Sequence, residues 1–291
     1  MVVAHSRVIQ RVCFWAALVL VAAFAPRSVI ATLQEPVSTN PAAAKPPSLS
    51  PAAMETFLLK APMSRIRDAG GGVTGSQRAT LSDGTLTHDV HIQTVDVAKP
   101  VFQAGEKSEV NFKDSYRYNI AGYRLARLVG LDTVPMSVER AVRGKTAAVT
   151  WWVDDVMMDE KARGAKGTAG PNPGRTTNQL HVMQVWDELI QNRDRNQGNI
   201  LWTSDWTMWL IDHTRAFRLG KELLKPEKLV RCERGLFERL KALTDQSIEE
   251  ALGKSLTKAE REAVLVRRDL IVQHFTDRIA RFGEEVALFT M

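Results

Sequence analysis

Short runs of alternating apolar and polar residues mark the first half of the chain. Residues 77–82 and 85–97 alternate in this way and are separated by Asp83-Gly84, a pair typical of a type I′ hairpin turn. A third run begins at residue 137 and a fourth covers 146–153, with a turn between them. Alternation with a period of two places one face of each run in a core, so this half predicts an antiparallel sheet.

One helix is expected inside this strand-rich half. Asp114 is its predicted N-cap, and Gly130 is expected to close it after Val129. Tyr116 and Ile120 belong to its apolar face.

The second half has apolar residues at every third or fourth position, which is typical of amphipathic helices. The pattern predicts helices over 226–243, 245–252 and 258–282. Thr257 and Glu260 form a capping box at the start of the last one. Strands followed by helices predict an α+β fold.

One polar loop interrupts a stretch that otherwise has the pattern of a core. A helix-periodic run ends at Ile190, a polar loop covers 192–198, and two short apolar runs follow, the second ending abruptly on Asp212. Ionised groups near a core cost free energy, so carboxylates and amides at the ends of short buried strands do not serve stability. They suit a site that holds metal and phosphate. The alternative is a tight loop and a hairpin with solvated surface charges.

The first 31 residues are predicted to be a secretory signal peptide. Arg7 and Arg11 precede an uncharged apolar run over 12–25, and a small-residue site follows at 29–31. The run is shorter than the roughly 20 residues that a spanning helix needs; an uncleaved anchor is the alternative. Residues 32–53 hold five prolines and are predicted to be an extended linker.

Charge and cysteine content exclude several classes of protein. The chain has a net charge of +6, and removal of the three arginines in the signal leaves +3. This mild charge, without a basic stripe that interleaves aromatics, argues against a nucleic-acid partner. Cys13 leaves with the signal and Cys232 stands alone, so no disulfide framework is expected. The sequence contains neither an H-E-x-x-H motif nor a Cys/His cluster, which disfavours a metal-dependent hydrolase.

The polar loop and the strand end after it resemble the catalytic elements of protein kinases. Asp194 and Asn199 have the spacing of the D-x-x-x-x-N loop, and Asp212 lies where a second metal-binding aspartate follows a strand. The segment looks most like the atypical protein-kinase-like superfamily: phosphatidylinositol 3/4-kinase-like, HipA-like and Fam20-like secreted kinases. The resemblance implies that Asp194 is the catalytic base or orients a hydroxyl, and that Asn199 and Asp212 bind Mg²⁺.

The resemblance also implies a bilobal domain over 54–291. Its N-lobe would be an antiparallel sheet over about 54–153 and its C-lobe mostly helical over about 154–291, with ATP between them. The implied nucleotide contacts lie in a glycine-rich turn, strand three, helix C and the hinge: Gly72, Thr74, Gly75, Ser76, His91, Gln93, Asn119, Trp152 and Val153. A plain flexible loop is the alternative for the glycine run, and core packing is the alternative for Trp152.

Two positions depart together from the kinase pattern. Gln93 falls where strand three carries its phosphate-binding lysine, and Asn119 falls where helix C carries the glutamate partner. A buried carboxylate without its cation is costly, whereas two amides can hydrogen-bond to each other. Lys99, Lys107 or Lys113 could bring a cation instead, and nothing in the sequence selects one. The alternative is a misaligned pair of surface amides.

These features predict a Mg²⁺- and ATP-dependent phosphotransferase that acts on a hydroxyl acceptor in the periplasm or outside the cell. The acceptor, whether protein, lipid or small molecule, is not identified by the sequence. The main alternative is an exported pseudokinase that binds nucleotide or scaffolds without catalysis. Transfer of AMP instead of phosphate is a third reading. No membrane span is expected after signal cleavage, because no other apolar run is long enough.

Overall fold

The computed structural model describes residues 49–69, 75–105 and 107–291. The predicted signal peptide and most of the predicted linker lie outside these ranges. The described part of the chain belongs to one compact unit, Ser48–Met291. Within it, none of the helices combines the length and the apolar character needed to cross a bilayer.

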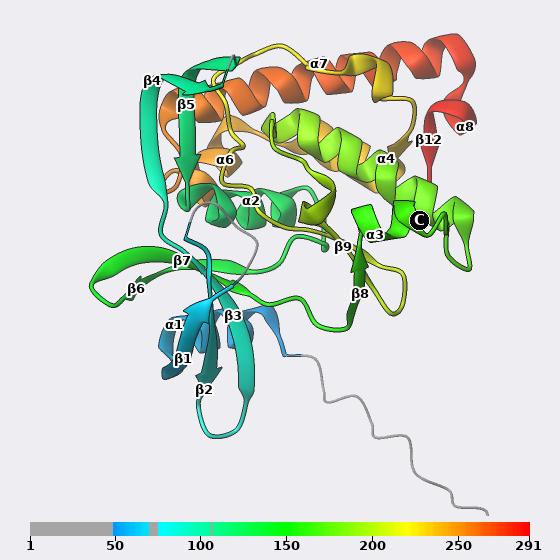
Figure 1. The fold of residues 1–291 in the computed structure, drawn as a ribbon. Helices are drawn as coiled ribbons and strands as arrows, with labels where there is room; N and C mark the ends of the chain where they lie inside the picture. The colour runs from blue at the N-terminus through cyan, green and yellow to red at the C-terminus, as the bar shows by residue number, and fades with distance from the viewer. Residues whose placement is uncertain (1–48, 70–74, 106) are drawn as a thin grey trace, which may run out of the picture. The chain divides into compact units, whose positions relative to one another are not determined.

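An antiparallel sheet with strand order β1-β2-β3-β7-β6 forms the N-terminal part (Figure 1). Its strands are β1 (Met63–Asp68), β2 (Gln77–Ser82), β3 (Thr87–Gln93), β6 (Ser137–Val142) and β7 (Lys145–Trp151). Ile92 and Val149 pack on one face of the sheet against Phe57 and Leu58 of helix α1 (Pro51–Lys60). Because successive side chains alternate, Asp89 and His91 lie on the other face. The predicted alternation and antiparallel pairing are confirmed.

Two local predictions in this part are corrected. Helix α1 begins at Pro51 with Ser50 as its N-cap, so the linker predicted through 53 ends earlier; proline suits the first helical position because its missing N–H is not needed there. The predicted two-residue hairpin turn is longer. The Asp83 side chain accepts the N–H groups of Thr85 (2.9 Å) and Leu86 (2.8 Å), which closes a wider turn.

A second hairpin separates the sheet from helix α2 (Arg117–Leu128). The single strand predicted over 85–97 is two strands, because β3 ends at Gln93 and β4 (Asp96–Ala104) pairs with β5 (Lys107–Ser115). Figure 1 shows this hairpin rising from the sheet toward α7. Asp114 lies inside β5 and is not the N-cap of α2, so that prediction was wrong.

Helices packed around one core form the C-terminal part. They include α4 (Pro173–Ile190), α5 (Arg234–Ala242), α6 (Asp245–Leu252) and α7 (Lys258–Phe282). A small sheet of order β10-β9-β8 lies beside them, with strands β8 (Val156–Asp159), β9 (Ile200–Thr203) and β10 (Met208–Leu210). Trp186, Trp202 and Phe275 are fully buried in this core. The last two predicted helices and the capping box of Thr257 and Glu260 are confirmed.

One prediction for this part needs correction. The polar stretch over 159–177 contains α3 (Glu160–Ala165) and the start of α4. The helix predicted over 226–243 is interrupted: a short turn η2 (Pro226–Lys228) precedes β11 (Cys232–Glu233), which pairs with β12 (Leu288–Phe289) after α8 (Glu284–Ala287). Strand pairing with the distant C-terminus overrides the local helical periodicity. Cys232 is buried, as expected for a core residue, and burial raises its pKa.

Candidate active site

The loop over 192–199 is fixed to its surroundings by Arg195. Its guanidinium pairs with Asp187 of α4 at 3.0 Å, and both side chains are largely buried. Nη1 also donates to the backbone carbonyls of Asn199 (3.0 Å) and Ile211 (2.8 Å). One side chain therefore joins α4, the loop and the end of the β9–β10 hairpin.

Asp194 lies in this loop with its carboxylate partly exposed. Its N–H donates to the side chain of Asn192 at 3.1 Å, and its carbonyl accepts the N–H of Asn196 at 2.8 Å. Burial raises the pKa of Asp194, the charge of Arg215 lowers it, and the charge of Asp212 raises it again. The two aspartates are therefore near enough to repel each other, and a shared cation would relieve that repulsion.

Asp212 adopts a left-handed backbone conformation, with φ of 53°, directly after the β9–β10 hairpin. Thr214 supports it by donating its hydroxyl to Oδ1 of Asp212 at 3.0 Å. The N–H of Ile211 donates to the carbonyl of Asn199 at 3.1 Å, so the backbone of Asn199 lies beside that of Ile211, the residue before Asp212. Such conformations cost free energy in a residue other than glycine and cluster at functional sites.

His213 fixes the same turn from the core side. The side-chain oxygen of Asn119 accepts the His213 N–H at 2.8 Å, and Trp186 donates its indole N–H to Nε2 of the ring at 3.1 Å. Complete burial, together with the nearby charge of Arg195, holds the pKa of His213 well below its usual value. A Cβ on Gly122 would lie 3.2 Å from Cγ of His213, so glycine lets α2 approach this turn.

Asp114 was predicted from the sequence to be a helix N-cap, but it is one of the carboxylates near the site. It is buried at the end of β5, and its Oδ1 has no hydrogen-bond partner within the described chain. Burial raises the pKa of Asp114, a hydrogen bond from Thr214 lowers it, and the charges of Asp212 and Asp194 raise it. An acidic residue before a helix is a common N-cap. That local pattern gives no indication that the folded chain brings Asp114 within reach of the charge of Asp212.

The two predicted amides are both buried, so neither is a surface amide. Oε1 of Gln93 accepts the N–H groups of Thr94 (2.9 Å) and Val95 (3.1 Å) at the end of β3. Asn119 uses its own oxygen on the turn that contains His213. The side-chain oxygen of each amide thus stabilises the backbone just after the end of a strand. Gln93 is neutral, so it brings no charge to the site.

The glycine-rich turn is described only from Gly75 onward, and the predicted contacts Gly72 and Thr74 lie outside the described residues. Gly75 has φ of +68°, which favours glycine. Ser76 hydrogen-bonds through its hydroxyl to Nε2 of His91. Burial lowers the pKa of His91 and the charge of Asp212 raises it, so this ring lies within electrostatic reach of Asp212.

The predicted hinge positions are partly occupied by the protein itself. Trp152 donates its N–H to the carbonyl of Asp89 at 3.2 Å, and the guanidinium carbon of Arg78 lies 4.1 Å from the centre of the indole. Asp89 holds that guanidinium at 2.7 Å. Val153 is buried. A base at this hinge would have to use polar groups other than the Trp152 N–H.

The structure narrows the choice among the three lysines that could bring a positive charge to the site in place of Gln93. Lys113 pairs with Glu260 of α7 at 2.5 Å, and Tyr118 donates to the same carboxylate oxygen. The charge of Lys113 is therefore already balanced by Glu260. Lys99 is exposed, with its Nζ 5.2 Å from the ring centre of Phe102. The side chain of Lys107 lies outside what the structure describes.

The segment after Asp212 is fastened to the end of α4. Arg267 of α7 is fully buried and donates to the carbonyls of Leu189 (2.9 Å) and Arg218 (3.0 Å). Glu188 accepts the N–H groups of Leu224 (2.6 Å) and Lys225 (2.9 Å). These contacts hold the segment in one position without any added group. Sequence reasoning missed them because arginine and glutamate in an amphipathic helix predict a solvated face.

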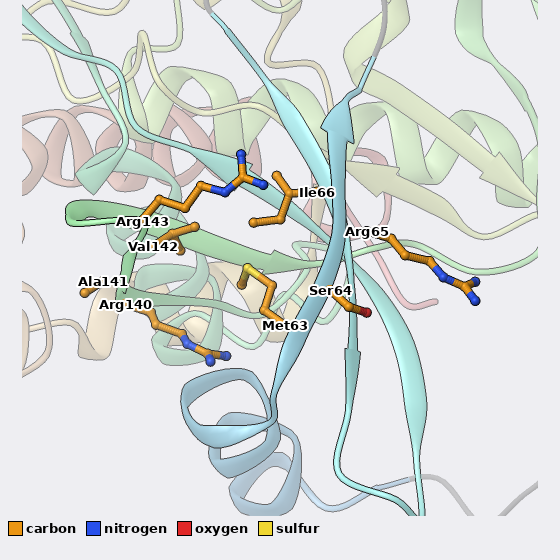
Figure 2. A pocket seen from close by; sticks show the side chains of 8 residues that line it. All are labelled: Met63, Ser64, Arg65, Ile66, Arg140, Ala141, Val142 and Arg143. Atoms are coloured by element: carbon orange, nitrogen blue, oxygen red, sulfur yellow. The ribbon is translucent and has the colours of Figure 1, made fainter.

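The carboxylates do not by themselves form a complete metal cage. In residues 49–69, 75–105 and 107–291, no set of at least three His, Cys, Asp or Glu side chains is grouped to hold an ion. A cavity of about 320 Å³ lies elsewhere, between β1 and β6, and contains none of the predicted site residues. Figure 2 shows Arg65 directed away from Ile66 and Arg143 of its lining. This cavity is not a candidate active site.

Comparison with known proteins finds similarity in structure only. No protein-family model matches the sequence, and no curated protein does. A solved structure of hydra Fam20 with sugar superposes with a TM-score of 0.62 at 15% identity, covering 82% of this chain and 92% of that one. The Golgi casein kinase with Mn/ADP bound gives 0.61 at 14% identity, over 81% and 77%. The predicted α+β kinase-like fold is confirmed, because the chain shares the fold of these two solved structures.

Proposed function

We propose that this protein is a phosphotransferase that moves the γ-phosphoryl group of ATP to a hydroxyl acceptor outside the cytoplasm, using Mg²⁺. The observation that carries the proposal is that one loop and the adjoining hairpin bring Asn199 beside the strand end before Asp212 and expose Asp194 to the charge of Asp212, in a kinase-like fold. The Mn/ADP bound to the Golgi casein kinase in its solved structure favours a nucleotide with a divalent cation here. The predicted signal peptide supports a reaction outside the cytoplasm.

The donor set fits a magnesium ion that also uses phosphate oxygens. Mg²⁺ in phosphotransferases is commonly bound by one or two carboxylates together with substrate phosphates, and not by a cage made of protein alone. Asp212 and Asn199 would hold it, and the unpartnered Oδ1 of Asp114 is a further oxygen within the same acidic neighbourhood. When bound, the ion would neutralise charge on the β- and γ-phosphates.

Asp194 orients the acceptor hydroxyl in this proposal. It accepts the hydroxyl proton while the acceptor oxygen bonds to the γ-phosphorus, and the bond to the bridging oxygen breaks with its electron pair left on ADP. Burial raises the pKa of Asp194, which makes it a better base than a free aspartate. Arg195 fixes the position of the loop relative to Asp212. Positioning of this kind supplies much of the catalysis in this reaction class.

A non-catalytic nucleotide-binding module is the second candidate. The neutral amide of Gln93 at the end of β3 favours it, because the phosphates then lose the cation expected on this strand. The three polar side chains at the loop disfavour it, since a scaffold has no need of them.

Calorimetry and label transfer on residues 32–291 separate these candidates. Wild-type protein should bind ATP in the presence of Mg²⁺, and Asp212→Ala should lose the magnesium-dependent part of that binding. Incubation with γ-³²P-ATP and a panel of hydroxyl-bearing acceptors should label an acceptor or the protein itself, and Asp194→Asn should bind ATP without labelling. Absence of nucleotide binding by wild type would refute the proposal. Label from α-³²P-ATP, without label from γ-³²P-ATP, would indicate AMP transfer.

A further inference from the structure

Arg215 carries a positive charge into the group of carboxylates. Its Nη1 lies 3.8 Å from Oδ2 of Asp194. Its charge lowers the pKa of both Asp194 and Asp114, so it is close to each. The side chain keeps 28% of its surface exposed, and a ligand that enters the site can therefore reach it.

Glu109 of β5 holds Arg215 from the opposite side but does not neutralise it. Nη2 of Arg215 donates to Oε2 of Glu109 at 2.6 Å, while Oε1 of the same carboxylate pairs with Arg218 at 2.6 Å. Arg218 is buried and also donates to the carbonyl of Asn111 at 3.2 Å. Two guanidinium groups thus share one carboxylate, and Arg218 is the more deeply buried of the two.

The guanidinium of Arg215 is also oriented and incompletely bonded. Its central carbon lies 5.1 Å from the ring centre of Phe112, which is within the range of a cation–π contact and supports the group from one side. Its buried Nε makes no hydrogen bond with the described residues. A buried donor without a partner costs roughly 1–3 kcal/mol, and this cost disappears when an acceptor binds. A planar guanidinium matches the oxygens of a phosphate group better than an ammonium does.

We propose that Arg215 binds the γ-phosphate of ATP and supplies the positive charge that Gln93 does not provide on β3. This inference rests on the proposed function. Charge spreads over the oxygens of the phosphoryl group during transfer, and a fixed guanidinium stabilises that charge without reorganising. Glu109 links this residue to the β4–β5 hairpin, so the hairpin is part of the phosphate site and not only an insertion between β3 and α2.

The test compares the affinities for ATP and ADP in the presence of Mg²⁺. A residue that contacts the γ-phosphate affects ATP and spares ADP, whereas a structural role affects both alike. Calorimetric titration of Arg215→Gln should show ATP affinity reduced about 10-fold or more and ADP affinity nearly unchanged. Phosphoryl transfer should fall on the order of 100-fold, the effect of removing one such donor. Arg215→Lys should recover part of the ATP affinity.

Two matched variants serve as controls. Arg193→Gln removes a nearby exposed arginine that faces Glu222 at 3.8 Å and should leave both affinities unchanged. Arg218→Gln removes the more deeply buried partner of Glu109, and we expect it to lower the melting temperature without a selective loss of ATP affinity. Equal losses of ATP and ADP affinity in Arg215→Gln would overturn the inference while the proposed function stands. Failure of wild type to bind either nucleotide would overturn both.

A second measurement needs no variant and so does not depend on the folding of Arg215→Gln. Phenylglyoxal modifies accessible arginines, and mass spectrometry locates the label. Mg²⁺ with a non-hydrolysable ATP analogue should protect Arg215 in wild-type protein, whereas Mg²⁺ with ADP should protect it little. Equal labelling of Arg215 with the analogue and with ADP would contradict contact with the γ-phosphate.

Discussion

The candidate site has a loop side and a sheet side, and they differ in how their polar groups are used. The loop side comprises Asp194, Asn199 and Asp212; the sheet side comprises His91, Gln93 and Asn119. On the loop side, buried ion pairs and backbone hydrogen bonds hold carboxylates that are themselves left partly exposed. On the sheet side, the side-chain oxygens of the buried amides accept hydrogen bonds from the protein's own backbone N–H groups.

This difference suggests which part of the chemistry the fold retains. A costly arrangement, such as the left-handed Asp212 beside other carboxylates, persists only when something offsets its cost. Buried amides carry no such cost once they are hydrogen-bonded. We infer that the requirement for cation and phosphate binding falls on the loop side and on the residues that reach it from β5.

The largest effect is expected from Arg195→Ala on the loop side. Loss of the guanidinium leaves the Asp187 carboxylate buried without its partner, and breaking such a pair costs about 3–5 kcal/mol. The loop also loses its bonds to the carbonyls of Asn199 and Ile211, so Mg²⁺-dependent ATP binding should disappear. Urea unfolding and calorimetry measure the two effects.

Arg163→Ala is the matched control for that variant. Arg163 pairs with Glu160 at 2.6 Å, with similar burial, but it belongs to α3, and its hydrogen bonds in the described structure go to Glu160 and Thr168, which are not predicted site residues. It should lower the free energy of unfolding and leave ATP binding intact. Loss of binding in both variants would mean that stability, and not the position of the loop, explains the result.

A smaller effect is expected from restoring the kinase pair on the sheet side. Gln93→Lys places an unpaired charge in a buried position and should lower the free energy of unfolding by about 2 kcal/mol. Adding Asn119→Glu should recover at least 1 kcal/mol as a coupling free energy, because the two charges can then pair. A double-mutant cycle by urea unfolding measures this coupling. Simple additivity would show that these residues are not counterparts of the lysine and glutamate.

The sequence alone predicted the parts of the fold that depend on local patterns. Helices α6 and α7 and the strands β2, β6 and β7 follow from periodicity and capping, which are properties of neighbouring residues. The break in the helix predicted over 226–243 could not be predicted, because β11 exists only through its pairing with β12 near the C-terminus. The strand predicted over 85–97 extends past the end of β3 at Gln93 for the same reason, because the end of a strand depends on its pairing with other segments.

The candidate site was foreseeable only where its spacing is local. Asp194 and Asn199 lie in one loop, and Asp212 follows the adjoining hairpin, so a short motif contained all three. Asp114 and Arg215 reach them through strand pairing and a bond between Ser115 N–H and the Thr214 carbonyl (2.9 Å), which no short motif records. The chemistry of the motif stays a prediction until it is measured.

The smallest of the expected effects concerns Asp114, which reaches the loop side from β5. Burial raises the pKa of this carboxyl above its ordinary value of 3.8, so the folded state binds more protons than the unfolded state between those two values. Stability from this group therefore falls as the pH rises through that window and stays reduced above it. At pH 7 without Mg²⁺, Asp114→Asn should be more stable than wild type by about 1 kcal/mol. The difference should vanish below the ordinary pKa.

Magnesium and a second aspartate make this prediction specific. Added Mg²⁺ with ATP should reverse the order, because wild type keeps an ionised oxygen for the site and Asp114→Asn does not. Asp205→Asn is the control of opposite sign: hydrogen bonds from Thr203 and Thr207 lower the pKa of Asp205, so its removal should destabilise the protein at pH 7 and matter less in acid. Urea midpoints between pH 3 and pH 8 measure both variants. A difference for Asp114→Asn that stays constant across this range would show that burial does not destabilise its ionised carboxylate. The approach of β5 to the loop side at this residue would then carry no electrostatic consequence.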